Sequence, residues 1–133
     1  MRIIMDALLG RFSHLGLPIF RVAVSLMMMN HGWGKLMKLM NGGEIKFINF
    51  MGLGPEISLG LAVIGELIAP LLILVGFKTR YAAFPALFTM GVAAFIVHGG
   101  DPLDEKELAL FYFFSFLLIF LTGPGAYSLD NKK

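Results

Sequence analysis

No cysteine occurs in the sequence, and this absence excludes a wide range of chemistry. Without thiols the chain cannot form disulfides, supply a thiolate nucleophile or hold iron–sulfur clusters and thiolate zinc sites. Charge is also scarce, because only 15% of the 133 residues are charged, against roughly a quarter in soluble domains. The net charge of +2 comes from basic residues that are scattered singly and form no nucleic-acid-binding patch. We therefore expect no nucleic-acid partner, and any redox role depends on a bound ligand or a partner protein.

Long apolar stretches dominate the chain, in which 57% of the residues are hydrophobic. They predict an all-α integral membrane four-helix bundle that forms a single domain over residues 1–133 of the chain and is surrounded by the lipid bilayer. The expected spans cover residues 15–37, 57–75, 81–97 and 107–122. The apolar part of the fourth span, Leu108–Leu121, is too short for a bilayer, so either its helix begins within the acidic residues before it or the bilayer thins around it.

The segment before the first span has a helical pattern of its own. Its apolar side chains recur at steps of three and four, whereas Arg2, Asp6 and Arg11 lie off this stripe. The pattern predicts a short interfacial helix over about residues 1–13. A secretory signal peptide is the alternative, but no small-residue cleavage site follows the apolar run.

The connections between the spans carry turn and cap signals. Gly76 is suited to the position after a helix C-terminus, and Thr79 to the N-cap of the next helix. Asp104 and Glu107 have the spacing of a capping box at the start of the fourth helix. The link over residues 41–55 is too apolar for a solvated loop, so we expect it to lie on the membrane or to fold over the mouth of the bundle.

Basic residues outside the expected spans indicate the orientation. Four spans place both termini on one side, and that side carries six Lys and Arg residues against three on the other. The six are Arg2, Arg11, Lys78, Arg80, Lys132 and Lys133, and the three are Lys38, Lys46 and Lys106. The positive-inside rule then places both termini in the cytoplasm, and we expect the chain in the cytoplasmic membrane.

Polar side chains interrupt two of the expected spans. They are Arg21, Asn30, His31 and Lys35 in the first span and Glu66 in the second. An ionised side chain near the bilayer centre costs about 2.5–3.5 kcal/mol or more, so such residues usually pair with one another or line a cavity. Pro70 strengthens the pattern, because it removes the N–H that would bond the carbonyl of Glu66.

We expect a polar cavity within the membrane, with Glu66 at its middle, Arg21 beneath it, and His31, Lys35 and His98 toward the outer mouth. Each residue also has a purely structural interpretation: Arg21 and Glu66 as an ion pair that locks the bundle, Lys35 reaching for the interface, and His98 capping a helix end. The two histidines lie at unequal depth and consecutive methionines point to different helix faces. We therefore expect no intrinsic metal or haem.

Taken in order, these pieces resemble the DoxX family of small bacterial and archaeal four-helix membrane proteins. The matching pieces are Arg21, the run His31-Gly32-Trp33-Gly34-Lys35, Gly65-Glu66, the run from Leu74 to Arg80, His98, Glu107, and Gly123-Pro124-Gly125 followed by Ser128-Leu129-Asp130. The resemblance implies a link to respiratory redox chemistry, since related DoxD-type subunits belong to a thiosulfate:quinone oxidoreductase. DoxX-like proteins are also associated with membrane oxidoreductase complexes in thiol and oxidative-stress defence.

We accordingly expect a redox subunit linked to a quinone or a sulfur compound, with a quinone as the candidate ligand. The expected catalytic residues are Glu66, His31 and Arg21, and the expected ligand-binding residues are Lys35, Trp33, Asn30, His98 and Glu107. A redox partner protein or a second copy of the chain would complete the system. The alternatives are a protein that binds or transports a small anion or small molecule, and a structural subunit of an oxidoreductase complex. The sequence leaves open whether the chain is itself an enzyme.

Overall fold

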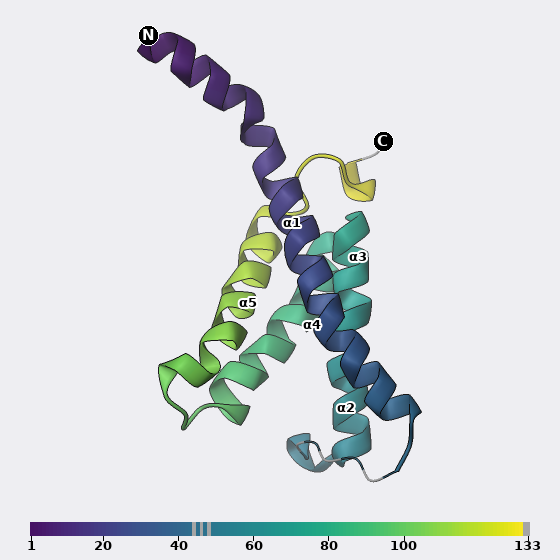
Figure 1. The fold of residues 1–133 in the computed structure, drawn as a ribbon. Helices are drawn as coiled ribbons and strands as arrows, with labels where there is room; N and C mark the ends of the chain where they lie inside the picture. Colours follow the sequence, from purple (N-terminus) through teal and green to yellow (C-terminus); the bar gives the residue numbers. More distant parts are fainter. Residues whose placement is uncertain (44, 46, 48, 132–133) are drawn as a thin grey trace.

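The structure is a computed structural model that describes residues 1–43, 45, 47 and 49–131. Within these residues every regular element is a helix. In chain order they are α1 (Arg2–Met40), η1 (Phe50–Gly52), α2 (Pro55–Val63), η2 (Ile64–Ile68), α3 (Ala69–Val75), α4 (Thr79–Val92), η3 (Ala93–Val97), α5 (Leu103–Thr122) and η4 (Leu129–Asn131). The start of α1 and the last described element, η4, lie toward the same end of the molecule (Figure 1).

Three helical stretches are long and apolar enough to cross a membrane. Among the described residues these are Arg2–Met40, Pro55–Val75, which joins α2, η2 and α3, and Thr79–Val97, which joins α4 and η3. They confirm an all-helical membrane protein. The fourth helix, α5, packs mainly against α4, and its role as a fourth span stays a prediction.

The start of α5 differs in part from the expectation. The helix begins at Leu103, within the acidic stretch as expected, and its first turn contains Asp104 and Glu105. The predicted capping box of Asp104 and Glu107 is wrong, because Pro102 occupies the N-cap position and no side chain caps the helix. With Pro102 before it, the helix starts one residue earlier than the predicted cap, so Asp104 already lies inside the first turn.

The predicted break between an interfacial helix and the first span is wrong as well. One helix of 39 residues runs from Arg2 to Met40, with Pro18 inside it. Pro18 removes only a single hydrogen bond, to the carbonyl of His14, and a continuous helix pairs the other backbone groups on both sides of Pro18 without water. The first ten residues are exposed, and this part of α1 projects beyond the other helices (Figure 1).

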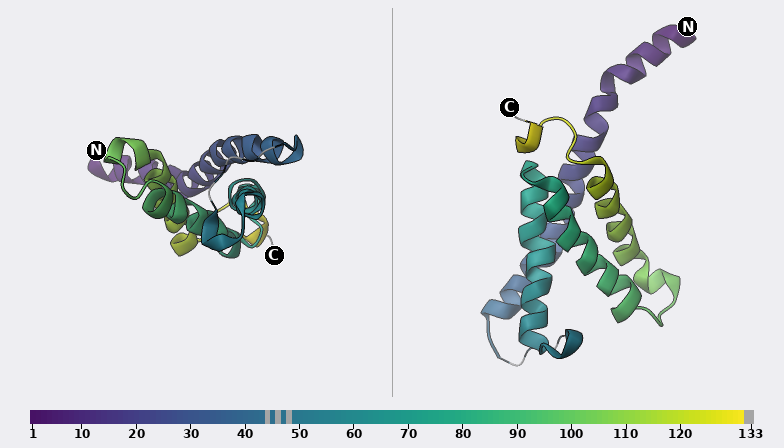
Figure 2. Two further views of the ribbon diagram at one scale, coloured as in Figure 1. Left: turned by 90° about the horizontal axis from the view of Figure 1, so that it is seen from below. Right: turned by 180° about the vertical axis from the view of Figure 1, so that it is seen from behind.

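The core lies where the helices pack closely, at the end of the molecule nearer the termini. Met28, Ile73, Ala83, Phe116 and Ile119 are each no more than 1% exposed. Small residues on α4 let the neighbouring helices come close to it, as is usual in membrane bundles. Toward the opposite end the helices diverge, as the view from behind shows (Figure 2).

A segment after α5 folds back over the turn between α3 and α4. Gly76 adopts a left-handed conformation with φ of 73°, as predicted for the residue that ends a helix. The Asp130 carboxylate accepts hydrogen bonds from the backbone N–H groups of Lys78 at 2.7 Å and Thr79 at 2.9 Å. The Asp130 N–H in turn donates to the Gly76 carbonyl at 2.8 Å. The distant Asp130 therefore caps α4, and the prediction of Thr79 as N-cap is wrong, since Thr79 is the first residue of the helix.

Candidate functional site

A partly buried ion pair joins α1 to η2. Lys35 Nζ lies 2.5 Å from Glu66 Oε2, and the side chains of Lys35 and Glu66 are 31% and 4% exposed. Lys35 therefore turns inward, and the expectation that it reaches for the interface is wrong. The pair satisfies a carboxylate that would otherwise be unpaired in a low-dielectric interior.

Two glycines let the backbones approach closely around this pair. A side chain at Gly32 would collide with the Glu66 carbonyl, and one at Gly65 would collide with the side chain of Thr89. Lys35 follows Gly32 by three residues, so the two share a face of α1. Gly32 thus brings α1 onto η2, and Lys35 then lies within reach of Glu66.

Two of the helical stretches that border the site, Pro55–Val75 and Thr79–Val97, each contain a π-helical turn. One such turn, η2, contains Glu66, and the Ala69 N–H bonds to the Ile64 carbonyl five residues earlier. The other, η3, ends at His98, whose N–H bonds to the Ala93 carbonyl. Single π turns within α-helices occur frequently at functional sites. The expected opening at the Glu66 carbonyl, which Pro70 leaves without its usual donor, stays a prediction.

A cavity of about 370 Å³ lies on one side of the ion pair. Its wall is mainly apolar and comes from α2, η2, α4, η3 and the segment before α2. The lining residues are Lys35, Phe47, Phe50, Ser58, Leu61, Ala62, Ile64, Gly65, Glu66, Pro85, Phe88, Thr89, Val92, Ala93, Val97 and His98. We call it the larger cavity.

Aromatic residues of the segment between α1 and α2 close part of the larger cavity. The Phe50 N–H donates to Ser58 Oγ at 2.9 Å, and the Phe50 ring meets Phe88 edge to face at a centroid distance of 6.2 Å. Lys35 Nζ lies 6.0 Å from the centroid of Phe47. Where it is described, the segment therefore folds over the bundle. Lys46, Lys132 and Lys133, which enter the count of basic residues, lie outside the described residues.

A second cavity, of about 220 Å³, lies between α1, η3 and α5. Its lining residues are Met28, His31, Lys35, Glu66, Met90, Ala93, His98, Glu105, Leu108, Ala109 and Tyr112. It shares Lys35, Glu66, Ala93 and His98 with the larger cavity. Glu66 and Lys35 thus stand in the wall between two cavities.

The histidines of the second cavity each have a partner. His31 meets Tyr112 edge to face, at a centroid distance of 5.8 Å. His98 Nδ1 lies 2.8 Å from Asp101 Oδ2. Glu105 and Tyr112 were not among the predicted site residues. The signals available in the sequence were the hydroxyl of Tyr112 in an apolar run and the place of Glu105 among the acidic residues before the last helix.

Arg21 has a different place from the predicted one. Its guanidinium donates hydrogen bonds to the carbonyls of Pro124 at 2.5 Å, Ala126 at 3.3 Å and Tyr127 at 3.0 Å. The predicted pairing of Arg21 with Glu66 is therefore wrong. Arg21 precedes Lys35 by four turns of the helix, or about 21 Å, so the two cations lie at opposite ends of the bundle.

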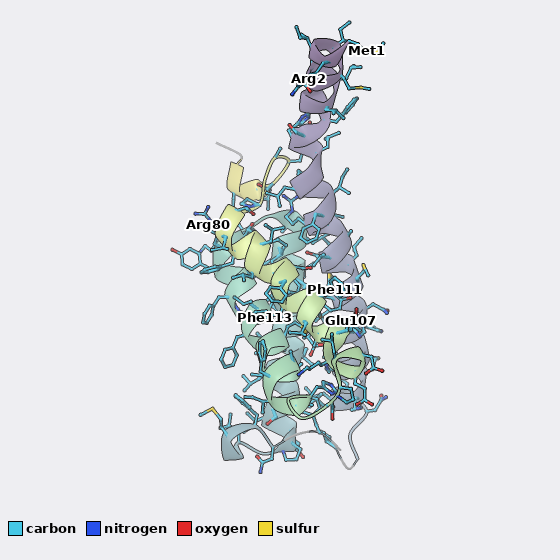
Figure 3. The ribbon with its side chains drawn as sticks, turned by 90° about the vertical axis from the view of Figure 1, so that its left-hand side faces the viewer. Met1, Arg2, Arg80, Glu107, Phe111 and Phe113 are labelled. Carbon is cyan, nitrogen blue, oxygen red and sulfur yellow. The ribbon has the colours of Figure 1, made fainter. Side chains whose placement is uncertain are left out.

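Three further predicted residues lie outside the two cavities. Asn30 and Glu107 are exposed, and Trp33 is 55% exposed. None of the three lines either cavity. Glu107 lies toward the end of the bundle remote from Arg80 (Figure 3). A ligand-binding role for these three residues stays a prediction.

Comparison with known proteins gives consistent matches. The model of the family described as DoxX matches residues 16–99. The chain is 33% identical over 131 residues to the inner membrane protein YqjF of Escherichia coli, covering 92% of this chain and 98% of that protein. It is 33% identical over 126 residues to the inner membrane protein YphA of the same organism, covering 87% and 89%. No solved structure matches the chain.

Proposed function

Because the chain belongs to the DoxX family, we propose that it acts in the bacterial inner membrane by binding a lipid-soluble quinone in the larger cavity. The observation that carries the proposal is the buried pair of Lys35 and Glu66 in the wall of a mainly apolar cavity. A proton donor and a proton acceptor thus meet an apolar chamber with aromatic walls. This combination suits a neutral ring that carries oxygen atoms.

The size and lining of the larger cavity fit such a ring. Its volume of about 370 Å³ lies within the range of roughly 300–1,000 Å³ that is usual for small-molecule sites. The rings of Phe47, Phe50 and Phe88 supply apolar flanks. A few polar groups among apolar walls are the usual means of orienting a ligand. A bound quinone would supply the two-electron chemistry that the side chains of this chain lack.

The chain's own residues would orient the ring and handle protons. The Lys35 ammonium can donate a hydrogen bond to a carbonyl oxygen while it remains near Glu66. The Glu66 carboxylate lies in the wall of the same cavity and can accept a proton from the ring and return it during turnover. Electrons would come from a redox partner protein or a small reductant.

The charge balance of the larger cavity argues against a small anion as the ligand. Lys35 is neutralised by Glu66, and His98 pairs with Asp101. Among the described residues that line the larger cavity, no other cation is present. Arg21 is occupied by backbone carbonyls at the far end of the bundle. A neutral apolar ligand is therefore favoured over an anion such as thiosulfate.

The test is mass spectrometry of an organic extract from the gently purified protein. We expect a quinone in near-stoichiometric amount in the wild type and its loss in both Glu66→Gln and Val92→Phe. The first variant removes the charged acceptor, and the second narrows the larger cavity without touching the ion pair. Phe111→Leu, on the exposed side of α5, is the matched control and keeps the quinone. A wild type without quinone, or equal amounts in all four proteins, overturns the proposal and favours a structural subunit.

A further inference from the structure

The second cavity differs from the larger one in its chemistry. Six of its eleven lining residues carry polar or titratable side chains. They are His31 and Lys35 from α1, Glu66 from η2, His98 from the end of η3, and Glu105 and Tyr112 from α5. We propose that the second cavity is a water-filled passage through which Glu66 exchanges protons with the solution at the end of the bundle where η3 connects to α5. This passage rests on its own lining and does not depend on which ligand the larger cavity binds.

The composition of the wall predicts that the second cavity contains water. Empty cavities in proteins are apolar, whereas a cavity that offers several hydrogen-bonding groups holds ordered water. A single water needs a cavity of only about 10–15 Å³, and the second cavity has a volume of about 220 Å³. It therefore has room for several waters beside the Glu66 carboxylate.

The polar groups form a series from the interior to the surface. Glu66 is 3% exposed, the side chain of His98 is 40% exposed, and Glu105 in the first turn of α5 is exposed. Asp101, which pairs with His98, lies in the same connection between η3 and α5. A proton delivered by water can thus pass from this connection to Glu66 without crossing the apolar larger cavity.

The proton balance needs no other reactant. A hydronium ion in the second cavity gives its proton to the Glu66 carboxylate and leaves as water, and the reverse step returns the proton. Lys35, His31, His98, Glu105 and Tyr112 are the titratable groups of the cavity wall. Together they set the electrostatic potential around the Glu66 carboxylate.

The first part of the test measures water in the second cavity. Because the chain has no cysteine, each of the variants Ala109→Cys and Phe111→Cys contains a single thiol. Ala109 lines the second cavity, whereas Phe111 is 65% exposed on another face of the same helix. That face meets lipid where α5 crosses the membrane, so Phe111→Cys serves as the control. In liposomes, a charged membrane-impermeant methanethiosulfonate should label the thiol of Ala109→Cys at least about tenfold faster than that of Phe111→Cys. The reagent reacts with the thiolate, and each unit by which apolar surroundings raise the thiol pKa lowers the thiolate fraction about tenfold. Equal labelling, or no labelling of Ala109→Cys, overturns the proposal.

The second part links the water to Glu66. The infrared carbonyl band of protonated Glu66, identified by its loss in Glu66→Gln, should respond to a rapid pH step. We expect a slower response in Ala109→Phe, which fills the second cavity, and an unchanged response in Val92→Phe, which narrows only the larger one. Equal responses in the two variants, or no titrating band, contradict the passage. Neither measurement requires a quinone, so the passage and the proposed function can fail separately.

Discussion

At the scale of single residues, the buried charges of this bundle serve two separate purposes. Arg21 binds backbone carbonyls and holds a segment of the chain in place. Lys35 and Glu66 bind each other beside two cavities. All three were singled out by the sequence because charge within a membrane span is costly. Only the pair at the cavities has the surroundings of a chemical site.

Replacing one partner of the ion pair between Lys35 and Glu66 should destabilise the protein strongly. Lys35→Met leaves the Glu66 carboxylate buried and unpaired, which typically costs about 3–5 kcal/mol. The double variant Lys35→Met, Glu66→Leu removes both charges and should regain most of that stability while losing the ligand. Thermal unfolding in detergent measures both effects. A single variant that melts like the wild type would show that the pair contributes nothing to the fold.

The Asp130 carboxylate should give the protein an acid-sensitive contact. Burial alone would raise the pKa of Asp130, but hydrogen bonds from Thr79 and Lys78 and the positive charge of Arg21 lower it below its ordinary value. Since the pKa is lower in the folded state, the stabilisation is complete above the unfolded pKa of about 3.9 and is lost as the pH falls through the folded value.

The measurement is unfolding of wild type and Asp130→Asn as a function of pH. We expect the two to differ above about pH 4 and to converge in stronger acid. Asp6→Asn, in the exposed first part of α1, is the matched control and should follow the wild type. Parallel curves for wild type and Asp130→Asn at all pH values would contradict the assignment.

At the scale of elements, the face of α1 that meets η2 depends on one position without a side chain. A methyl group at Gly32 would collide with the Glu66 carbonyl. Gly34, two residues later, has nothing within 4 Å of the place where a methyl group would lie. Alanine substitutions at Gly32 and Gly34 therefore distinguish the effect of close packing from the general preference of helices for alanine over glycine.

Gly32→Ala should lower the stability by about 1–3 kcal/mol, as overpacking usually does. Gly34→Ala should be neutral or stabilise the helix by up to about 1 kcal/mol. Thermal unfolding of the two variants in the same detergent measures the difference. Equal effects would mean that α1 does not pack on η2 at this point.

Much of the element pattern was predictable from sequence, and the failures at the site and at the cap of α4 come from contacts between residues far apart in the chain. The left-handed Gly76 was predicted correctly because its signal is local. The cap of α4 was missed because Asp130 reaches it from 51 residues away. Glu66 and Lys35 were both identified, but helical periodicity gives no information on how one helix is turned against another. Arg21 was misassigned because backbone carbonyls leave no trace in a pattern of side chains.

At the scale of the whole molecule, the ends of the bundle differ in charge as well as in packing. Arg80 lies at the end that holds both termini, and Glu107 toward the other end (Figure 3). The polar second cavity lies among the diverging helices, away from the termini. If the positive-inside rule applies, the proposed passage then faces the side of the membrane opposite to the cytoplasm.

Topology reporters test this orientation. Green fluorescent protein fused after the C-terminus should fluoresce, and alkaline phosphatase fused there should be inactive, because the first matures in the cytoplasm and the second outside it. The same reporters inserted after Gly100, in the connection between η3 and α5, should give the opposite result if α5 crosses the membrane. Identical results at both positions would mean that α5 does not span it.

The bonds of Arg21 also have a consequence for the order of synthesis. Its acceptors lie between 103 and 106 residues later in the chain, so the ribosome makes every long helix before Arg21 can meet them. During membrane insertion the guanidinium therefore lacks these partners, and a prematurely terminated chain never acquires them. An incomplete copy keeps a solitary charge within a lipid-facing helix, which is a mark that cellular quality control can use to remove it.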